Sequence, residues 1–347
     1  FNKFKVNNID IGLITRGAEI NNISYRTSDI NNASKARVLV KKRSKIVNHD
    51  LNGYKKDEFK PRVPFPIISY SFDPDVRAHV GSPERFAYTG LGIKLNTEIQ
   101  LNRHSTVYAS IIQNITDNFD EKISCPCSAI PNARTLIVDY LQESDGLYMK
   151  NFQIDNIRGY GKDLFTRLSL GYFEQMYGGF SSEILYKPLK YNFALGIEFN
   201  ELRQRAFNGK LDFKKYKVTT GHFNVAYYEP RTNILAKWSY GRYLAKDDGY
   251  TLDLSRRMPN GWKAGLFFSQ TSVSSVDFGE GSFDKGFYFE IPFNIFTKRE
   301  TKDKFNFSLR TMTRDGGQKL VIENRLIDSF YGSTFSEINE NWRGYLK

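Results

Sequence analysis

The sequence predicts an all-β chain, an antiparallel barrel of about fourteen strands behind a small N-terminal α/β module. Three observations favour this fold. Apolar and polar residues alternate with a period of two from Pro66 onward, which is the period of strands. The chain has 28 Phe, 21 Tyr and 26 Gly, and strands favour aromatic residues while turns need glycine. The links between these segments are short and long in turn, as in an up-and-down barrel.

The N-terminal residues differ from the rest of the chain. The stretch KFKVNNIDIGLI (3–14) predicts a strand, and SDINNASKARVLV (28–40) predicts a short helix. The charged stretch that follows ends in prolines and predicts a linker. The expected divisions are an α/β module with its linker at 1–60, a barrel at 61–330 and a C-terminal tail at 331–347.

The predicted strands each have one apolar and one polar face. In FALGIEFN (193–200), for example, Phe, Leu, Ile and Phe alternate with Ala, Gly, Glu and Asn. Links such as 229–233 are short, whereas 116–146, 174–181 and 206–216 are longer. Counting from 66–80 to a last strand at 318–327 gives about fourteen strands, an even number, which returns both chain ends to the short-turn side of a barrel.

The stretch FGEGSFDKGFYFEIPFNIF (278–296) raises the question of which solvent the apolar faces meet. A loop of glycine and charge is followed by strict alternation. A soluble sandwich or barrel would bury the apolar face in a core, and it remains an alternative. Large aromatics opposite small or charged residues, on strands near the length of a tilted bilayer span, favour lipid instead. The predicted lipid-facing residues are Phe287, Phe289, Ile291 and Phe293.

The same alternation places charged and polar side chains in the barrel interior. They could line a path for an acidic polysaccharide, with Tyr228 and Tyr288 stacking on sugar rings. Alternatively they pair with one another, because charges in a narrow interior need partners, and their mixed signs favour pairing. The predicted interior residues are Lys94, Glu98, Arg167, Glu198, His222, Lys237, Asp253, Arg257, Lys263, Tyr288, Glu290 and Arg310.

The net charge and the two cysteines place few limits on what the protein can bind. The net charge of +12 is compatible with an acidic partner or with a basic surface that serves solubility. No nucleic-acid-binding motif fits, so we expect no nucleic-acid partner. Cys125 and Cys127 form a CPC motif, a poor zinc site. A disulfide across one residue is strained, and both that disulfide and two free thiols stay open. Nothing at Phe1 resembles a signal peptide, so we expect a mature protein or a fragment of a longer one.

An enzymatic interpretation requires a catalytic constellation. An outer-membrane hydrolase uses serine, histidine and an acid, and His222, Ser239 and Asp253 are predicted to lie on the interior face. No nucleophile-elbow motif accompanies them, and a histidine hydrogen-bonded to neighbouring hydroxyls is the favoured interpretation. The loop GEGSFDKG lacks the ligand spacing of a calcium loop. We expect no catalytic residue, metal or cofactor.

Four stretches carry a family resemblance. GRYLAKDDGYTLDLSRRMPNGWKAGLFFSQTSVSSVDFGEGSFDKGFYFEIPF (241–293) closely resembles the YjbH/GfcD family of Gram-negative outer-membrane proteins. The stretches YKVTTGH (216–222), GGFSSEILYKPL (178–189) and TRDGGQKL (313–320) support it. The resemblance covers most of residues 64–327.

The resemblance implies a non-enzymatic β-barrel in the bacterial outer membrane, with periplasmic termini, that acts in export or surface assembly of an exopolysaccharide or capsule. It implies outer-membrane lipid and other exopolysaccharide-export proteins as partners, and the basic interior residues add an acidic polysaccharide as a candidate partner. Family members are about twice as long and have two barrel regions, so a missing N-terminal half is a further expected partner. A plugged barrel that docks other export proteins and an outer-membrane hydrolase remain the alternatives.

Overall fold

The computed structural model describes residues 8–15, 18–26, 45–46, 65–80, 87–121, 129–143, 146–161, 163–188, 191–258, 261–274, 277, 283–292, 304–310 and 315–329. Within these residues the chain is mostly β-strand, and helices are limited to a few short pieces. Neighbouring strands pair antiparallel throughout both sheets. The predicted all-β antiparallel class is therefore confirmed.

Three N-terminal strands form a small sheet of their own. β1 (Asn8–Thr15), β2 (Ala18–Arg26) and β3 (Lys45–Ile46) are hydrogen-bonded in the order β1-β2-β3. β1 coincides with most of the predicted strand at 3–14. The helix predicted at 28–40 and the tail at 331–347 lie outside the described residues.

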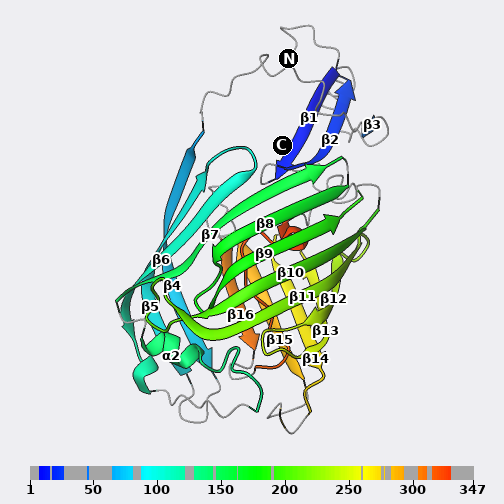
Figure 1. Ribbon diagram of the computed structural model, residues 1–347. Coiled ribbons are helices and arrows are strands. Elements are labelled where there is room, and N and C mark those ends of the chain that lie inside the picture. Colours follow the sequence, from blue (N-terminus) through cyan, green and yellow to red (C-terminus); the bar gives the residue numbers. More distant parts are fainter. Residues whose placement is uncertain are drawn as a thin grey trace.

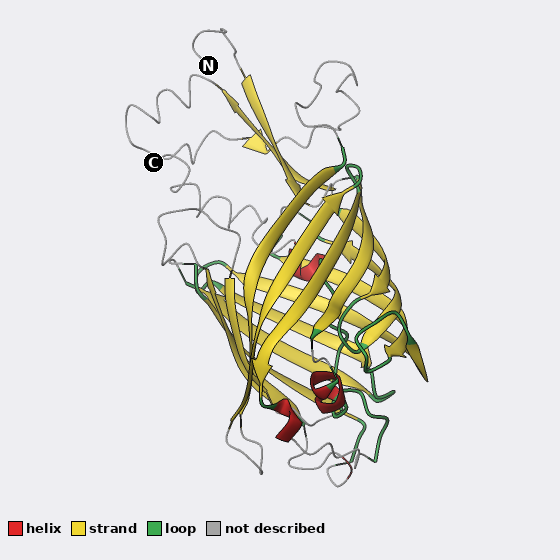
Figure 2. Ribbon diagram, turned by 90° about the vertical axis from the view of Figure 1, so that its left-hand side faces the viewer, coloured by secondary structure: helices red, strands yellow, loops and turns green. Residues whose placement is uncertain are grey.

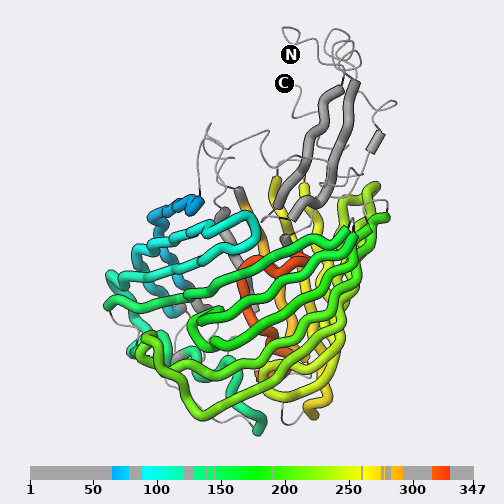
Figure 3. Tube along the Cα trace, turned by 45° about the horizontal axis from the view of Figure 1, so that its top comes forward, coloured from blue at the N-terminus to red at the C-terminus, as the bar shows by residue number. Residues whose placement is uncertain are grey.

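Thirteen strands form the second sheet, each beside its sequence neighbours, in the order β4 to β16. Figures 1 and 3 show that this sheet curls, with β7 to β12 in front and β14 to β16 behind. The described residues contain no ladder between β4 and β16. The strands are β4 (Ile67–Val80), β5 (Ala87–Gln100), β6 (Ser105–Asp117), β7 (Leu147–Tyr160), β8 (Leu164–Tyr172), β9 (Tyr177–Tyr186), β10 (Phe193–Arg205), β11 (Phe213–Glu229), β12 (Ile234–Arg242), β13 (Asp248–Arg257), β14 (Lys263–Thr271), β15 (Asp284–Pro292) and β16 (Lys304–Arg310).

The links between strands lie at two rims. We call them the turn rim and the loop rim. Of the described residues, the turn rim contains 101–104, 161, 163, 187–188, 191–192, 230–233, 258 and 261–262, and the loop rim contains 118–121, 129–143, 146, 173–176, 206–212, 243–247, 272–274, 277 and 283. The long link expected at 174–181 is wrong. β9 already begins at Tyr177, and its first residues pair with β8 and β10, so only a short turn remains.

The fourteenth strand, predicted at 318–327, is also wrong. Residues 315–329, which we call the inner segment, lie on the hollow side of the sheet and end in the short helix α4 (Leu326–Ser329). Figure 3 shows this segment in red inside the curve. Because the sheet has an odd number of strands, thirteen, the chain reaches the loop rim at the end of β16. The inner segment then runs back toward the turn rim through the interior.

Apolar clusters hold the inner segment at both ends. Toward the turn rim, Leu326 and Ile327 pack with Phe165, Leu185 and Leu235. Toward the loop rim, Leu320 packs in a cluster that also contains side chains of α2 (Ile137–Gln142). The 3-10 helix η3 (Phe119–Glu121) packs beside α2. Figure 2 shows short helices at the loop rim and another within the curve of the sheet. The hollow side beside β8 to β12 is thus a packed interior.

Candidate functional site

A row of polar side chains crosses the hollow face, which we call the inner face, between the two apolar clusters. Strand register places Arg167, Glu183, Glu198 and His222 side by side on β8, β9, β10 and β11. All four side chains are buried. Because a buried charge is costly unless it is paired, the partners of this row determine what it can do.

Arg167 holds the β8 end of the row. Its Nε lies 3.2 Å from Oε2 of Glu183, and both side chains are fully buried. Its other guanidinium nitrogens donate to the hydroxyls of Ser169 and Ser181 at 2.6 and 3.1 Å. The Ser169 hydroxyl in turn donates to Asp155 Oδ1 at 2.6 Å. This part of the row is a satisfied network within the wall of the sheet.

The two glutamates face each other across β9 and β10, and like charges directly opposite are destabilising. The inner segment supplies their partners. The backbone N–H groups of Leu326 and Ile327 donate to Glu183 at 2.8 and 3.2 Å. Arg325 Nε lies 3.0 Å from Glu198 Oε2. The wall and the inner segment therefore form one charge network.

Two further contacts fix the inner segment along its length. Asn324, which has a left-handed φ of 58°, donates from Nδ2 to Asp155 Oδ2 at 2.7 Å. At the loop rim, the Asp315 carboxylate accepts hydrogen bonds from the backbone N–H groups of residues 133–135 at 2.7, 2.7 and 3.0 Å. Asp315 thereby ties the longest loop of this rim to the start of the inner segment.

A cavity of about 400 Å³ lies on the inner face toward the turn rim. Six of the predicted interior residues line it, together with Leu235 and with Asp328 of the inner segment. The six are Lys237, Asp253, Arg257, Lys263, Tyr288 and Glu290.

The charges of this cavity pair across neighbouring strands. Lys237 Nζ lies 2.9 Å from Asp328 Oδ1 and 3.8 Å from Asp253 Oδ2. The Tyr288 hydroxyl donates to Asp253 at 3.0 Å. Similarly, Lys263 and Glu290 lie opposite each other on β14 and β15 with a separation of 2.8 Å. The cavity is polar, but most of its charges already have protein partners.

The inner segment lies off the strands and carries two groups with shifted pKa values. Burial alone would raise the pKa of Asp328, but the Lys237 ammonium and the Arg325 guanidinium hold it well below its usual range. Burial, and after it the nearby Arg325 guanidinium, lowers the pKa of Lys319 to about 7. Lys319 and Arg325 line a second cavity, of about 310 Å³, between the inner segment and the sheet. The charge state of the inner segment thus depends on its burial against the sheet and on the charges around it.

The structure does not assemble the hydrolase constellation. The Ser239 hydroxyl donates to Asn224 at 2.7 Å, and Asp253 pairs with Lys237 and Tyr288 as above. Neither ring nitrogen of His222 has a hydrogen-bond partner among the described residues. The expectation that neighbouring hydroxyls satisfy His222 is therefore wrong. Its ring instead packs edge-to-face on Tyr243, with the centroids 4.9 Å apart.

The remaining predicted interior residues lie apart from this network. Lys94 and Glu98 are half-buried on β5, and Glu98 accepts a hydrogen bond from Tyr108 at 3.3 Å. Arg310 is the last residue of β16. Tyr228 is buried in the turn-rim apolar cluster. It has no free ring face for a sugar, so the stacking hypothesis is wrong for Tyr228.

The opposite face of the sheet, which we call the outer face, is apolar and exposed. Phe287 and Phe289 are 41% and 37% exposed, and their rings are in edge contact with centroids 5.8 Å apart. Ile291 is half-buried. Phe293, Cys125 and Cys127 lie outside the described residues. Among the helices that the structure describes, none combines the length and the apolar character needed to cross a membrane.

Sequence patterns missed the residues that organise the interior. Arg205 is fully buried at the loop rim and donates to five backbone carbonyls. Asp315 and Arg325 lie on a segment that was predicted to belong to the wall or to its end. One signal for Asp315 existed, since TRDGGQKL (313–320) is among the stretches that carry the family resemblance.

Comparison with known proteins gives a relative and a solved structure. The chain is 33% identical over 269 residues to "Uncharacterized lipoprotein YjbH" of Escherichia coli (strain K12), a match that covers 75% of this chain and 38% of that protein. OmpT, an outer membrane protein of Vibrio cholerae, matches 74% of this chain and 91% of its own at 9% identity, with a TM-score of 0.30. That score is too low to establish a shared fold.

The chain therefore spans well under half of the curated relative that it matches. A family model described as "Exopolysaccharide biosynthesis protein YbjH" matches residues 3–330. This match extends over nearly the whole chain and includes both sheets and the inner segment. The chain belongs to the YjbH family of exopolysaccharide biosynthesis proteins.

Proposed function

We propose that this chain forms an outer-membrane β-barrel that takes part, without enzymatic activity, in export or surface assembly of an exopolysaccharide. In this proposal the inner segment fills much of the barrel, which serves as a structural component that docks other export proteins. The observation that carries the proposal is the joint network of wall and inner segment, in which Arg325 pairs with Glu198 and the backbone of Leu326 caps Glu183.

A membrane location is supported by the two faces of the curled sheet. The outer face exposes large apolar side chains on most of its strands, among them Ile93, Leu170, Ile197, Phe223 and Leu266, whereas charged residues are buried on the inner face. A soluble β-sheet protein has the opposite arrangement. Apolar-out and polar-in alternation is typical of outer-membrane barrels. Closure between β4 and β16 is part of this proposal.

An open conduit for a sugar chain is less well supported. Such a path requires the inner segment to move away from the inner face of the sheet. Departure exposes Leu326 and Ile327 and leaves Glu198 without Arg325, and removal of one partner from a buried ion pair costs about 3–5 kcal/mol. We therefore favour the docking role over passive conduction. Against the hydrolase alternative, His222, Ser239 and Asp253 do not form a hydrogen-bonded triad.

The experiment is insertion and conductance of the purified chain in planar lipid bilayers. We expect the wild-type chain to insert and to show little ion current. A variant with Glu183→Ala, Glu198→Ala and Arg325→Ala is expected to release the inner segment and to open frequent, larger current steps. Steady large currents in the wild type would favour the conduit, and failure to insert would refute the barrel itself.

A second measurement tests the docking role. The chain carrying an affinity tag is expressed in an exopolysaccharide-secreting Gram-negative host, and crosslinked envelope proteins are identified. Other export proteins are expected to crosslink at both rims in the wild type. Secretion that responds to the chain without any such crosslink would argue against docking.

A further inference from the structure

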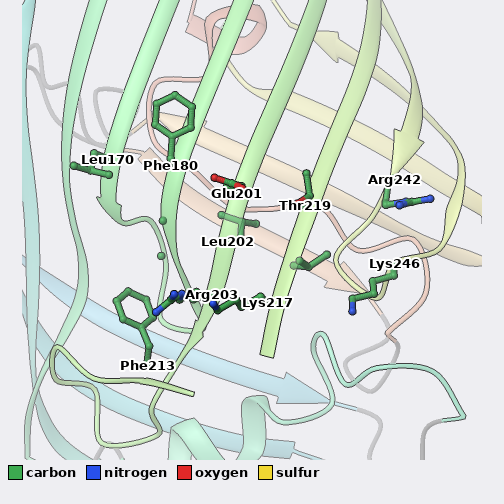
Figure 4. Close-up of a pocket in the computed structure, with 13 residues that line it drawn as sticks. Leu170, Phe180, Glu201, Leu202, Arg203, Phe213, Lys217, Thr219, Arg242 and Lys246 are labelled. Atoms are coloured by element: carbon green, nitrogen blue, oxygen red, sulfur yellow. The ribbon is translucent and has the colours of Figure 1, made fainter. Parts of the chain in front are cut away.

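A depression of about 760 Å³ lies on the outer face at the loop rim, across β8 to β12. Figure 4 shows Arg203 and Lys217 near one another beside Phe213, with Arg242 and Lys246 on the other side. Four cations and a single acid, Glu201, are among the residues that line it. We call this surface the basic depression.

Glycine makes the depression possible. Gly178 and Gly179 lie between the side chains of Leu170, Phe180 and Phe213. A Cβ atom at Gly179 would lie 2.1 Å from the Glu201 carbonyl oxygen, so this site cannot hold a side chain without moving the backbone. The result is a hollow with an apolar wall on one side and cations on the other.

Two of the four cations of the depression, Arg203 and Lys217, are not neutralised by a described side chain. Arg203 and Lys217 lie directly opposite each other on β10 and β11, and both are exposed. Neither side chain has a hydrogen bond or an ion pair with another described residue. Like charges directly opposite each other on neighbouring strands are destabilising. Arg242 pairs with Asp248 at 3.1 Å, and Lys246 lies over the Tyr216 ring at 5.3 Å.

The position of the depression on the sheet is informative. On the same face and the same strands, the exposed aromatic residues Phe199, Phe223 and Tyr240 lie nearer the middle of the sheet. Arg203 follows Phe199 by four residues, which is roughly 13 Å along the strand. An apolar band that ends in aromatics and then in basic residues is the pattern of a membrane interface.

We infer that the basic depression binds the phosphate-bearing headgroup of an anionic glycolipid in the outer leaflet. Lysine and arginine form strong charge-assisted hydrogen bonds with phosphate, and a phosphate would relieve the repulsion between Arg203 and Lys217. Phe180 and Phe213 would contact the apolar part of the same molecule. The inference rests on the proposed function in one respect, that the outer face meets lipid at the loop rim.

The test measures binding in non-ionic detergent micelles, so it does not depend on bilayer insertion. Thermal unfolding of the whole chain is followed with bis-phosphorylated lipid A, with dephosphorylated lipid A and with inorganic phosphate. We expect a higher unfolding temperature with phosphorylated lipid A only. In the double variant Arg203→Gln/Lys217→Gln, we expect affinity for this lipid to fall about tenfold or more.

The double variant also carries an internal control for folding. Without lipid its unfolding temperature should equal or exceed that of the wild type, because the like-charge repulsion is gone. The matched variant Arg158→Gln/Arg256→Gln removes the same charge from exposed positions near the turn rim and should keep the lipid effect.

Three outcomes overturn the inference. Equal stabilisation by dephosphorylated lipid A means that phosphate is not recognised. Equal stabilisation by inorganic phosphate means a simple anion site without lipid. Loss of the effect in Arg158→Gln/Arg256→Gln means that net charge alone is responsible. Failure of the chain to insert into bilayers would instead refute the proposed barrel, whatever the micelle experiment gives.

Discussion

Arg325 and Glu198 join the inner segment to the wall of the sheet, with Nε of the arginine 3.0 Å from Oε2 of the glutamate. The two residues are 127 positions apart in the sequence. Glu198 lies opposite Glu183, and Arg167 forms its ion pair with Glu183, so without Arg325 the Glu198 carboxylate would lose its own ion pair while facing a second buried carboxylate. The inner segment therefore supplies a positive charge that balances a carboxylate buried in the sheet.

Removal of this arginine should be costly. We expect Arg325→Met to lower the free energy of unfolding by about 3–5 kcal/mol, because it leaves a buried carboxylate unpaired. The double variant Arg325→Met/Glu198→Gln should recover part of that loss, which a double-mutant cycle measures. The control is Asp248→Asn, which breaks the exposed pair with Arg242 and should cost at most about 1 kcal/mol. Equal losses for both pairs would contradict the role assigned to Arg325.

The tether at the loop rim makes a second prediction. Asp315 accepts three backbone hydrogen bonds from residues 133–135, and bonds to a charged group contribute about 1.5–3 kcal/mol each. We expect Asp315→Ala to speed amide hydrogen exchange at residues 133–135 while exchange in β8 to β10 stays slow. The matched change Asp212→Ala, in an exposed turn of the same rim, should leave these amides protected. Unchanged exchange in Asp315→Ala would argue against the tether.

The sequence was sufficient to predict the strands of the curled sheet and insufficient to predict the segment that lies inside it. A period of two identifies a strand and its two faces wherever the strand lies, so it predicted the class and the opposed faces at 287–291. Residues 318–327 also alternate, with Leu320 and Ile322 against Lys319 and Glu323. That local pattern cannot distinguish a strand of the wall from an extended segment inside it.

The difference is decided by contacts that no local pattern contains. The inner segment is held by Asp155, Glu183 and Glu198, all more than a hundred positions away in the chain. The candidate site was predictable only where both partners lie on adjacent strands. Lys263 and Glu290 are such a pair, opposite each other in register, whereas Arg325 and Asp328 reach their partners through the fold.

The backbone of the basic depression makes a third prediction. Gly179 has a φ of +148°, and a Cβ atom there would meet the backbone oxygen of Glu201. We expect Gly179→Ala to destabilise the chain strongly, because strands β9 and β10 must separate to admit the methyl group. Gly161 also has a positive φ, +65°, but has open space around it, so Gly161→Ala should cost only about 1–2 kcal/mol. Denaturant unfolding of the two variants in detergent measures the difference, and equal costs would contradict the close approach of the strands.

The burial of Lys319 on the inner segment predicts that the stability of the chain depends on pH. The pKa of Lys319 is lowered from 10.5 to about 7 in the folded chain, chiefly by burial and further by Arg325. Between these two values the unfolded chain keeps the proton and the folded chain does not, so the free energy of unfolding rises with pH across this window. Relative to Lys319→Met, the wild type should therefore gain stability from pH 7 to about pH 10, and below pH 7 the two curves should run parallel. Denaturant unfolding of both proteins at a series of pH values tests this. Parallel curves throughout would mean that Lys319 keeps an ordinary pKa and that the inner segment does not bury its amine.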